Sequence, residues 1–367
     1  MPLGRLADRT NRRNLMVIAI AGWSLSTVFC GLASNFWELF IARMVLGLGE
    51  ACLAPAAFSM LVDYFPPSQR GRAITLAQAG TPLGSATAVF GGGLFLSLYA
   101  SAGLAAFAPA GWAPWKSLFV VSAVPGFLVA AAVALLREPP RHGAAGEPAP
   151  PLWPFVRRHG AAFWTMCLVS TLYTAIGYSV VNWTPSVLMR IHHMAPAQAG
   201  LASSLILLLC SAPGNVSAGF LSDWLDRRRG AEGRAVAPML LTPLLVIALA
   251  WLALSRGLAS SLGALVLTFF LFSIIANTVW PALQAMTPSR LRGQALAIYL
   301  LFGNVAGLGL APTLVGAMND YLFHDEMMLQ VSVGVVNGAL AVAALVAASA
   351  LPRLYAETRR AIAAEAS

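Results

Sequence analysis

Long apolar runs alternate with short polar segments along the whole chain. The runs lie at 14–33, 37–62, 73–99, 116–136, 160–189, 197–221, 235–255, 257–286, 294–318 and 330–351. A helix of about 20 apolar residues crosses the hydrocarbon core of a bilayer. The runs lack the period-two alternation of barrel strands, and a backbone in lipid must satisfy its own hydrogen bonds. The pattern therefore predicts an all-α membrane protein with ten spanning helices.

The composition supports this fold class. Of the 367 residues, 58% are hydrophobic and only 10% are charged, whereas a soluble domain has about 25% charged residues. The first apolar run has no cleavage site of small residues, so it is not a signal peptide. The composition excludes an ordinary soluble domain.

The positive charges follow the alternation of the apolar runs. Of the 23 basic residues, 19 lie in alternate polar segments, and the opposite segments hold only Lys116, Arg190 and Arg256. This positive-inside distribution predicts that both termini lie in the cytoplasm. The net charge of +9 then reflects orientation and anionic lipid headgroups rather than a nucleic-acid partner.

A polar, proline-rich segment divides the chain. Residues 137–159, "REPPRHGAAGEPAPPLWPFVRRH", are too long for a tight turn between helices and have the composition of a linker. We therefore expect an N-terminal bundle at 1–136, a cytosolic linker at 137–159, and a C-terminal six-helix bundle with a tail at 160–367.

The two bundles share a motif. The stretch "GRLADRTNRR" at 4–13 returns as "GFLSDWLDRR" at 219–228, which aligns Gly4, Asp8, Arg12 and Arg13 with Gly219, Asp223, Arg227 and Arg228. An Arg-Gly step also follows in both bundles, in "PSQRGRA" and "PSRLRGQA". Internal duplication is typical of transporter folds. Two helices precede the second copy and none the first, so we expect two further helices, encoded upstream, ahead of residue 1.

These motifs resemble a known family. "GRLADRTNRR" is similar to the loop between helices 2 and 3 of the major facilitator superfamily, and "RMVLGLGEA" at 43–51 to its fourth helix. "GEACLAPAAFSMLVDYFPPSQRGRA" and "NWTPSVLMRIHHMAPAQAG" resemble the bacterial spinster-like branch, although anion:cation symporters share part of the first stretch. The resemblance implies two six-helix halves and alternating access around a central cavity. Here the halves have four and six helices.

Two ionisable residues lie well inside one predicted span. Arg43 and Glu50 are seven residues apart, which places them on one helix face about 10 Å apart along the axis. A charge at mid-membrane costs about 2.5–3.5 kcal/mol, so each needs a partner or a wet cavity. We expect Glu50 to bind and release a proton, and Arg43 to hold a substrate carboxylate or phosphate. The alternative is a structural charge network.

The resemblance also implies which helices line the cavity. The family's seventh and tenth helices correspond to 160–189 and 257–286, and their polar and aromatic residues are candidates for binding substrate: Tyr173, Tyr178, Asn182, Asn277, Trp280 and Gln284. Aromatic rings beside amides suit an amphiphilic ligand. Packing and amide bonding between helices is the alternative.

The repeated charged motif is a further candidate site. As loop residues, its members are expected to act as a cytosolic latch whose aspartates and helix ends exchange partners when the halves rock. The predicted set is Gly4, Asp8, Arg12, Arg13, Asp63, Arg70, Gly219, Asp223, Arg227 and Arg228, with Asp63 reached through Arg12 or Arg13. The alternative is a role in setting topology alone.

These observations lead to one functional expectation and two alternatives. We expect a monomeric secondary transporter, proton-coupled, for an organic anion or an amphiphilic, lipid-like solute. The alternatives are a truncated membrane protein that does not transport, and a symporter of sugar acids or aromatic acids. No enzyme activity, cofactor or metal is expected, because Lys116 has no P-loop around it and the chain contains neither HExxH nor GxSxG.

Overall fold

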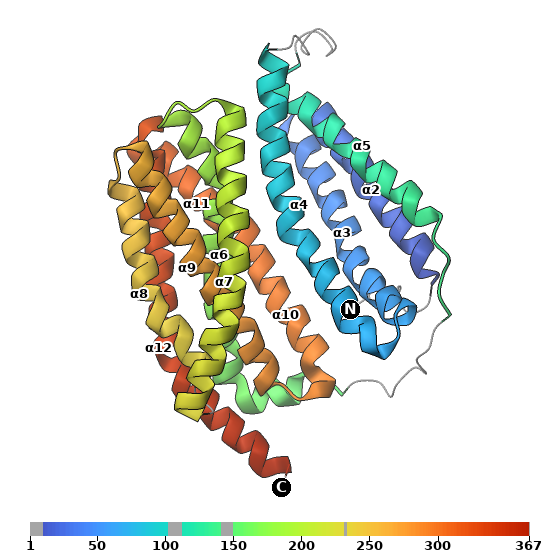
Figure 1. Ribbon diagram of the computed structural model, residues 1–367, viewed down its shortest axis with the longest axis vertical. Coiled ribbons are helices and arrows are strands. Elements are labelled where there is room, and N and C mark those ends of the chain that lie inside the picture. Colours follow the sequence, from blue (N-terminus) through green and yellow to red (C-terminus); the bar gives the residue numbers. More distant parts are fainter. Residues whose placement is uncertain (1–9, 102–111, 141–149, 231–232, 367) are drawn as a thin grey trace. The chain divides into compact units, whose positions relative to one another are not determined.

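The computed structural model describes residues 10–101, 112–140, 150–230 and 233–366, which are helical and contain no strand (Figure 1). The first half holds α2 (Arg12–Leu32), α3 (Phe36–Tyr64), α4 (Pro67–Ser101) and α5 (Pro114–Ala134). The second half holds α6 (Trp153–Arg190), α7 (Pro196–Arg229), α8 (Gly233–Leu254), α9 (Leu258–Met286), α10 (Arg292–Asn304), α11 (Ala311–Ala317) and α12 (Leu329–Ala366).

The predicted spans correspond to these helices. Within the described part of the chain, nine helices are long and apolar enough to cross a membrane. The tenth predicted span, 37–62, lies in α3, which is helical but is not among the nine. The expected class, an all-α membrane protein, is confirmed.

One predicted span differs from a regular helix. The run 294–318 is built from α10 and α11 joined by a π-helical segment, Val305–Leu310 (η4), and is followed by a second, Met318–Phe323 (η5). Pro312 is the second residue after the end of η4. A proline has no amide hydrogen and its ring crowds the preceding turn, and a π segment is a common way to absorb that misfit.

The chain divides into two compact units, residues 1–146 and 147–367. The boundary falls inside the proline-rich segment 137–159 that the sequence marks as a linker. The assignment of these units to the two halves of a transporter stays a prediction. Each unit is described below by itself.

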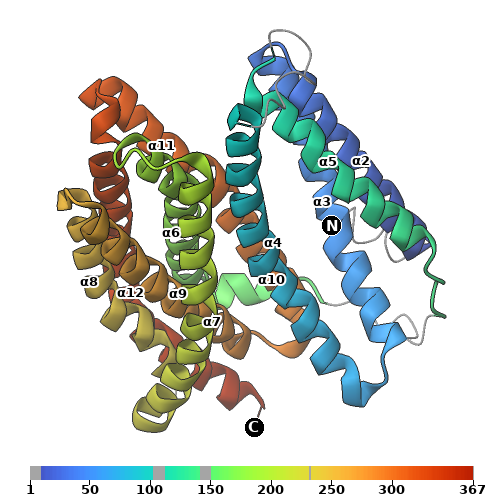
Figure 2. The same ribbon diagram turned by 45° about the horizontal axis from the view of Figure 1, so that its top comes forward.

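In the first unit, α2 packs against both α3 and α5, and Figure 2 shows α2 and α5 running alongside each other. Glycines allow this approach. A Cβ on Gly31 would lie 2.6 Å from the Lys116 carbonyl oxygen, and one on Gly126 would overlap the Ser24 hydroxyl. Small residues at such points let helices pack closely where lipid supplies no hydrophobic drive. The helix α4 makes few contacts with α3 and α5.

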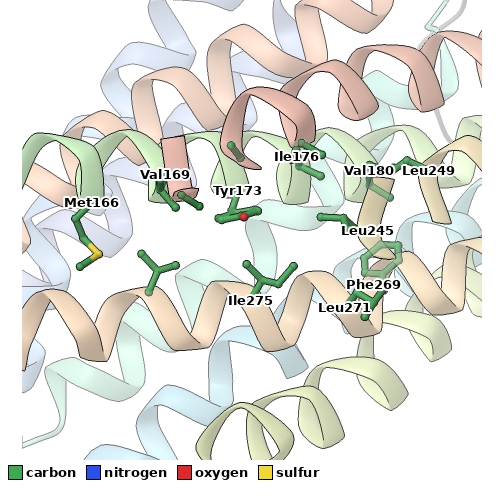
Figure 3. Packing of buried hydrophobic residues seen from close by; sticks show 14 of the residues in the cluster. Met166, Val169, Tyr173, Ile176, Val180, Leu245, Leu249, Phe269, Leu271 and Ile275 are labelled. Carbon is green, nitrogen blue, oxygen red and sulfur yellow. The ribbon is translucent and has the colours of Figure 1, made fainter. Parts of the chain in front are cut away.

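In the second unit, α6 packs against α7, α9, α10, α11 and α12. One face of α6 is apolar at helical spacing, and Figure 3 shows this face opposite side chains of α8 and α9. The labelled residues of this core are Met166, Val169, Tyr173, Ile176, Val180, Leu245, Leu249, Phe269, Leu271 and Ile275. Such a stripe fixes which side of α6 is buried and which is left for other contacts.

Candidate functional site

The first candidate site lies where α2 begins. Arg12 is only 2% exposed, and its guanidinium donates to Asp63, to the Ser59 hydroxyl at 2.9 Å, to Glu138 at 2.9 Å and to the Pro139 carbonyl at 3.0 Å. Asp63 comes from the end of α3, and Glu138 follows α5. One buried cation therefore joins the ends of three helices.

Local sequence explains how Arg12 reaches this position. The Asn11 side chain accepts a hydrogen bond from the Asn14 amide at 2.8 Å and caps α2, as Asn does at many helix starts. Glu138 accepts the next free amides, from Arg12 at 3.3 Å and from Arg13 at 2.8 Å. A carboxylate is favourable at this end of a helix because the unpaired N–H groups carry positive charge.

The same contacts shift the ionisation of Glu138. Burial raises its pKa, but hydrogen bonds from the Arg13 amide and from Arg12 outweigh burial, and the net pKa of Glu138 lies below its ordinary value. A carboxyl with a lowered pKa stabilises the fold above its ordinary pKa, and that contribution is lost as the pH falls through the lowered value. The contact is thus fully formed at neutral pH.

Sequence reasoning anticipated part of this cluster. It named Arg12, Arg13 and Asp63 but missed Glu138, and the signal that could have found it is the acid in "REPP", two residues after the fourth predicted span. Gly4, Asp8 and the side chain of Arg70 lie outside the described residues. The role of the cluster as a latch stays a prediction.

The second copy of the motif lies on a helix, which corrects the expectation of a loop. The helix α7 continues to Arg229 and ends at Gly230, whose φ is 61°, a conformation that suits glycine at a helix end. Its last turns therefore carry the whole repeat: Gly219, Asp223, Arg227 and Arg228. Asp223 is exposed, and the Arg228 guanidinium lies 4.6 Å from the centroid of the Trp224 ring. Among the motif residues that the structure describes, Arg12 is buried whereas the aligned Arg227 is exposed.

The second candidate site is on α3. Arg43 and Glu50 are both exposed, and the Arg43 guanidinium lies 5.1 Å from the centroid of the Phe119 ring of α5. Gly49, beside Glu50, faces α2, where a Cβ would lie 3.1 Å from the Ala19 carbonyl oxygen. Among the described residues, no carboxylate forms an ion pair with Arg43. The pairing expected for a structural charge network is therefore not seen there.

The third candidate site joins α7 and α9. The Asn277 amide donates to the Asn215 side-chain oxygen and, at 2.7 Å, to the Ser273 carbonyl. The Ser273 hydroxyl also approaches Asn215, at 3.3 Å. Both asparagines are exposed. Sequence reasoning named Asn277 for binding but not Asn215, so the amide pair emerges only from the packing of the two helices.

The remaining predicted binding residues are scattered. Tyr173 is 1% exposed, and its hydroxyl bonds to that of Thr242 inside the core, so this residue is corrected from the binding set to the core. Tyr178 is 38% exposed and Asn182 is exposed, while Gln284 is half-buried. The side chain of Trp280 lies outside the described residues.

The described residues offer no cluster of three or more His, Cys, Asp or Glu side chains that would suit a metal ion. Cys30, Cys167 and Cys210 are buried as free thiols. The arrangement as described is one of charged and amide groups on helices. Charged and amide side chains are suited to binding polar or charged ligands by hydrogen bonds.

Comparison with known proteins identifies the family. The model of the Major Facilitator Superfamily matches residues 1–312. The chain belongs to the major facilitator superfamily. It is 25% identical over 321 residues to the 3-(3-hydroxy-phenyl)propionate transporter of Escherichia coli, which covers 86% of this chain and 72% of that protein. With Protein spinster homolog 1 of Homo sapiens it shares 28% identity over 350 residues, covering 87% of this chain and 62% of the relative.

Solved structures agree with this family. The crystal structure of a bacterial homolog of the human lysosomal transporter Spinster, inward-facing and unoccupied, is similar with a TM-score of 0.74 at 25% identity, over 98% of this chain and 85% of that one. The D-xylose-proton symporter shares the fold with a TM-score of 0.69 at 16% identity, over 97% and 85% of the two chains. These likenesses confirm a spinster-like member of the superfamily, an integral membrane protein of a transporter family.

Proposed function

We propose that this protein is a proton-coupled secondary transporter that moves an organic anion by alternating access across a bacterial inner membrane, with both termini cytoplasmic. Its relatives support this: one carries 3-(3-hydroxy-phenyl)propionate in its name, and the Hexuronate transporter of Bacillus subtilis, 24% identical over 339 residues, names another carboxylate. Proton coupling has a precedent in the D-xylose-proton symporter. The single observation that carries the choice of an anion is Arg43.

Arg43 is suited to a carboxylate. An arginine inside an apolar helix costs about 2.5–3.5 kcal/mol on insertion scales, and such residues mark substrate or ion pathways. Its described contact is with the face of Phe119, and a cation–π contact occupies none of the five N–H donors of the guanidinium. Those donors match a carboxylate in a bidentate arrangement.

Glu50 is the proposed proton carrier. It lies on α3 two turns from Arg43 and is exposed. Its carboxyl group is therefore available to exchange a proton with water. Anion binding at Arg43 and proton binding at Glu50 would take place on the same helix, two turns apart. The movement of the anionic substrate is thereby linked to the movement of the proton.

The likeness to spinster proteins favours a second cargo, an amphiphilic, lipid-like solute. The anionic headgroup of such a solute would bind Arg43 of α3. Such a ligand pairs a few placed polar groups with apolar walls. The two cargo classes are separated by the substrates used in the assay below.

Glu50→Gln tests the coupling. The purified full chain is placed in proteoliposomes under an imposed pH gradient, and uptake of radiolabelled hexuronate, 3-(3-hydroxyphenyl)propionate and lysophosphatidylglycerol is measured. For the substrate that the unaltered protein accumulates, Glu50→Gln is expected to lower gradient-driven uptake to that of protein-free vesicles, because an amide does not titrate. Binding of the same substrate without a gradient is expected to persist.

Glu326→Gln is the matched control, because Glu326 is 77% exposed in a surface ion pair with Arg190. It should transport as the unaltered protein does. Gradient-driven uptake at the unaltered rate in Glu50→Gln would refute the coupling role. Absence of uptake for every substrate, with the protein folded, would favour a membrane protein that does not transport.

Arg43→Ala tests anion recognition. Loss of charge-assisted hydrogen bonds worth about 1.5–3 kcal/mol predicts roughly a 10- to 100-fold weaker Kd for the accepted anion. The amide analogue of that anion should bind both proteins alike, and Arg190→Ala should leave the Kd unchanged. Equal losses for the anion and its neutral analogue would instead assign Arg43 a structural role, and isothermal titration calorimetry measures both.

A further inference from the structure

A hollow of about 480 Å³ opens at one end of the second unit, where the end of α7 meets α8 and α12. It lies within this unit alone, and Arg229 in its wall directly follows the second copy of the repeated motif. Its walls are Arg229, Val236, Met239, Ser349, Pro352, Arg353, Ala356, Glu357 and Arg360.

Positive charge predominates in this hollow, where three guanidinium groups surround one carboxylate. The Arg353 Nε donates to Glu357 at 2.9 Å, which occupies one of the five donors of Arg353. Arg353 and Glu357 are 87% and 56% exposed, so their ion pair is worth little in itself. The charged rim of the hollow, formed by Arg229, Arg353, Glu357 and Arg360, therefore attracts an anion and contributes little to holding the helices together.

The floor of the hollow is apolar. Val236 and Met239 come from the first turns of α8, and Pro352 and Ala356 come from the facing side of α12. A small inorganic anion gains nothing from such a floor, whereas a ligand with both a charged group and hydrocarbon gains from each part.

The position along the helices matches the headgroup layer. The apolar run of the last span ends near residue 351, and α12 continues as a helix to Ala366. The basic end of α7, Arg227 to Arg229, contributes Arg229 to the wall of the hollow. The positive-inside distribution assigns this end to the cytoplasm, where basic pockets between helices meet anionic lipid headgroups.

We propose that this hollow is a binding site for an anionic phospholipid. The lipid phosphate is bound by Arg229, Arg353 and Arg360, and the first carbons of the chains lie on Met239 and Pro352. Bidentate contacts of arginine with phosphate oxygens supply the specificity for charge. Because the site spans α8 and α12, a bound lipid ties these two helices together at the membrane surface.

The double variant Arg353→Gln/Arg360→Gln tests this site. The purified full chain in detergent is titrated with phosphatidylglycerol, phosphatidylcholine or inorganic phosphate, and bound lipid is resolved by native mass spectrometry. The unaltered protein is expected to hold one tight phosphatidylglycerol, with about tenfold weaker binding in the double variant, from the loss of charge-assisted bonds. The matched control Arg190→Gln/Arg256→Gln removes two arginines at the opposite end and should bind as the unaltered protein does.

Glu357→Gln provides a test in the opposite direction. Removing the one negative charge of the rim is expected to strengthen phosphatidylglycerol binding by about two- to fivefold, the scale of a solvent-exposed charge pair. This variant also decides the question if the double variant does not fold. A merely structural ion pair would instead leave binding unchanged or weaken it.

Three results would overturn the proposal. The first is equal phosphatidylglycerol binding in the double variant and the unaltered protein. The second is equal affinity for phosphatidylcholine, which carries no net charge. The third is displacement of phosphatidylglycerol by inorganic phosphate at the same concentration, which would mark a site for soluble anions.

Discussion

Two arginines of the first unit show how surroundings decide the role of one side chain. Arg12 is buried against Asp63 and Glu138, whereas Arg43 is exposed and lies over Phe119. Both begin as cations on apolar helices. The first is committed to partners within the fold, and the second is the residue that we propose to bind an anion.

The buried contacts of Arg12 predict that its replacement lowers the stability of the fold strongly. Arg12→Ala leaves two carboxylates without their cation, and removal of one partner from a buried ion pair costs about 3–5 kcal/mol. We expect a clearly lower Tm for the purified protein, measured by intrinsic fluorescence in detergent. Arg13→Ala is the control, because the Arg13 guanidinium makes exposed contacts and surface contacts are worth about 1 kcal/mol or less. Similar melting of the two variants would contradict a stabilising cluster.

At the scale of single residues, the sequence predicted some of the contacts between residues and missed others. A contact between Arg12 and Asp63 was foreseeable because both flank apolar runs on the predicted cytosolic side. Glu138 also flanks an apolar run on this side, but it is 126 residues from Arg12 and the sequence does not show which helix ends meet, so this contact was missed. Tyr173 was misassigned because an aromatic residue inside a span reads alike whether it faces a cavity or the core.

At the scale of elements, the apolar runs located the helices well but not their ends. The helix α7 continues eight residues past the predicted end at 221, to Arg229, because a helix leaving the bilayer satisfies its own backbone and has no reason to stop at the lipid boundary. The π segments around α11 were not foreseeable from hydropathy, since they change hydrogen bonding without changing composition.

Close packing of α8 against α12 gives a prediction at this scale. A Cβ on Gly334 would lie 2.5 Å from the Ala253 Cβ and 2.8 Å from the Leu249 carbonyl oxygen. Gly334→Leu must therefore displace backbone, and overpacking of this kind costs about 1–3 kcal/mol. A lower Tm in detergent is expected.

Gly338→Leu is the matched control on the same helix, since a Cβ at Gly338 meets nothing within 4 Å. Its Tm should equal or exceed that of the unaltered protein, because glycine is unfavourable inside a helix. If both variants melt together, the contact between α8 and α12 does not limit stability.

At the scale of the whole molecule, the distribution of arginines predicts orientation. Arg256 lies between α8 and α9, and Arg290 lies between α9 and α10; both are exposed. In a cysteine-free background, a membrane-impermeant maleimide added to intact cells is expected to label Arg256→Cys. Arg290→Cys should react only after the cells are permeabilised. The opposite pattern would reverse the orientation and place the proposed lipid site on the other face.

Hydropathy and charge along the sequence determined the class of the protein, the number and places of its helical runs and the linker between two units. These features follow from transfer of local segments into lipid, which depends on composition over about 20 residues. The motifs also sufficed for the family. Tertiary structure alone decided which polar groups come together: Glu138 with Arg12, Asn215 with Asn277, and Arg229 of α7 with two arginines of α12 around one hollow. Such contacts join residues far apart in sequence, and they depend on which face of each helix packs against its neighbours, which hydropathy does not encode.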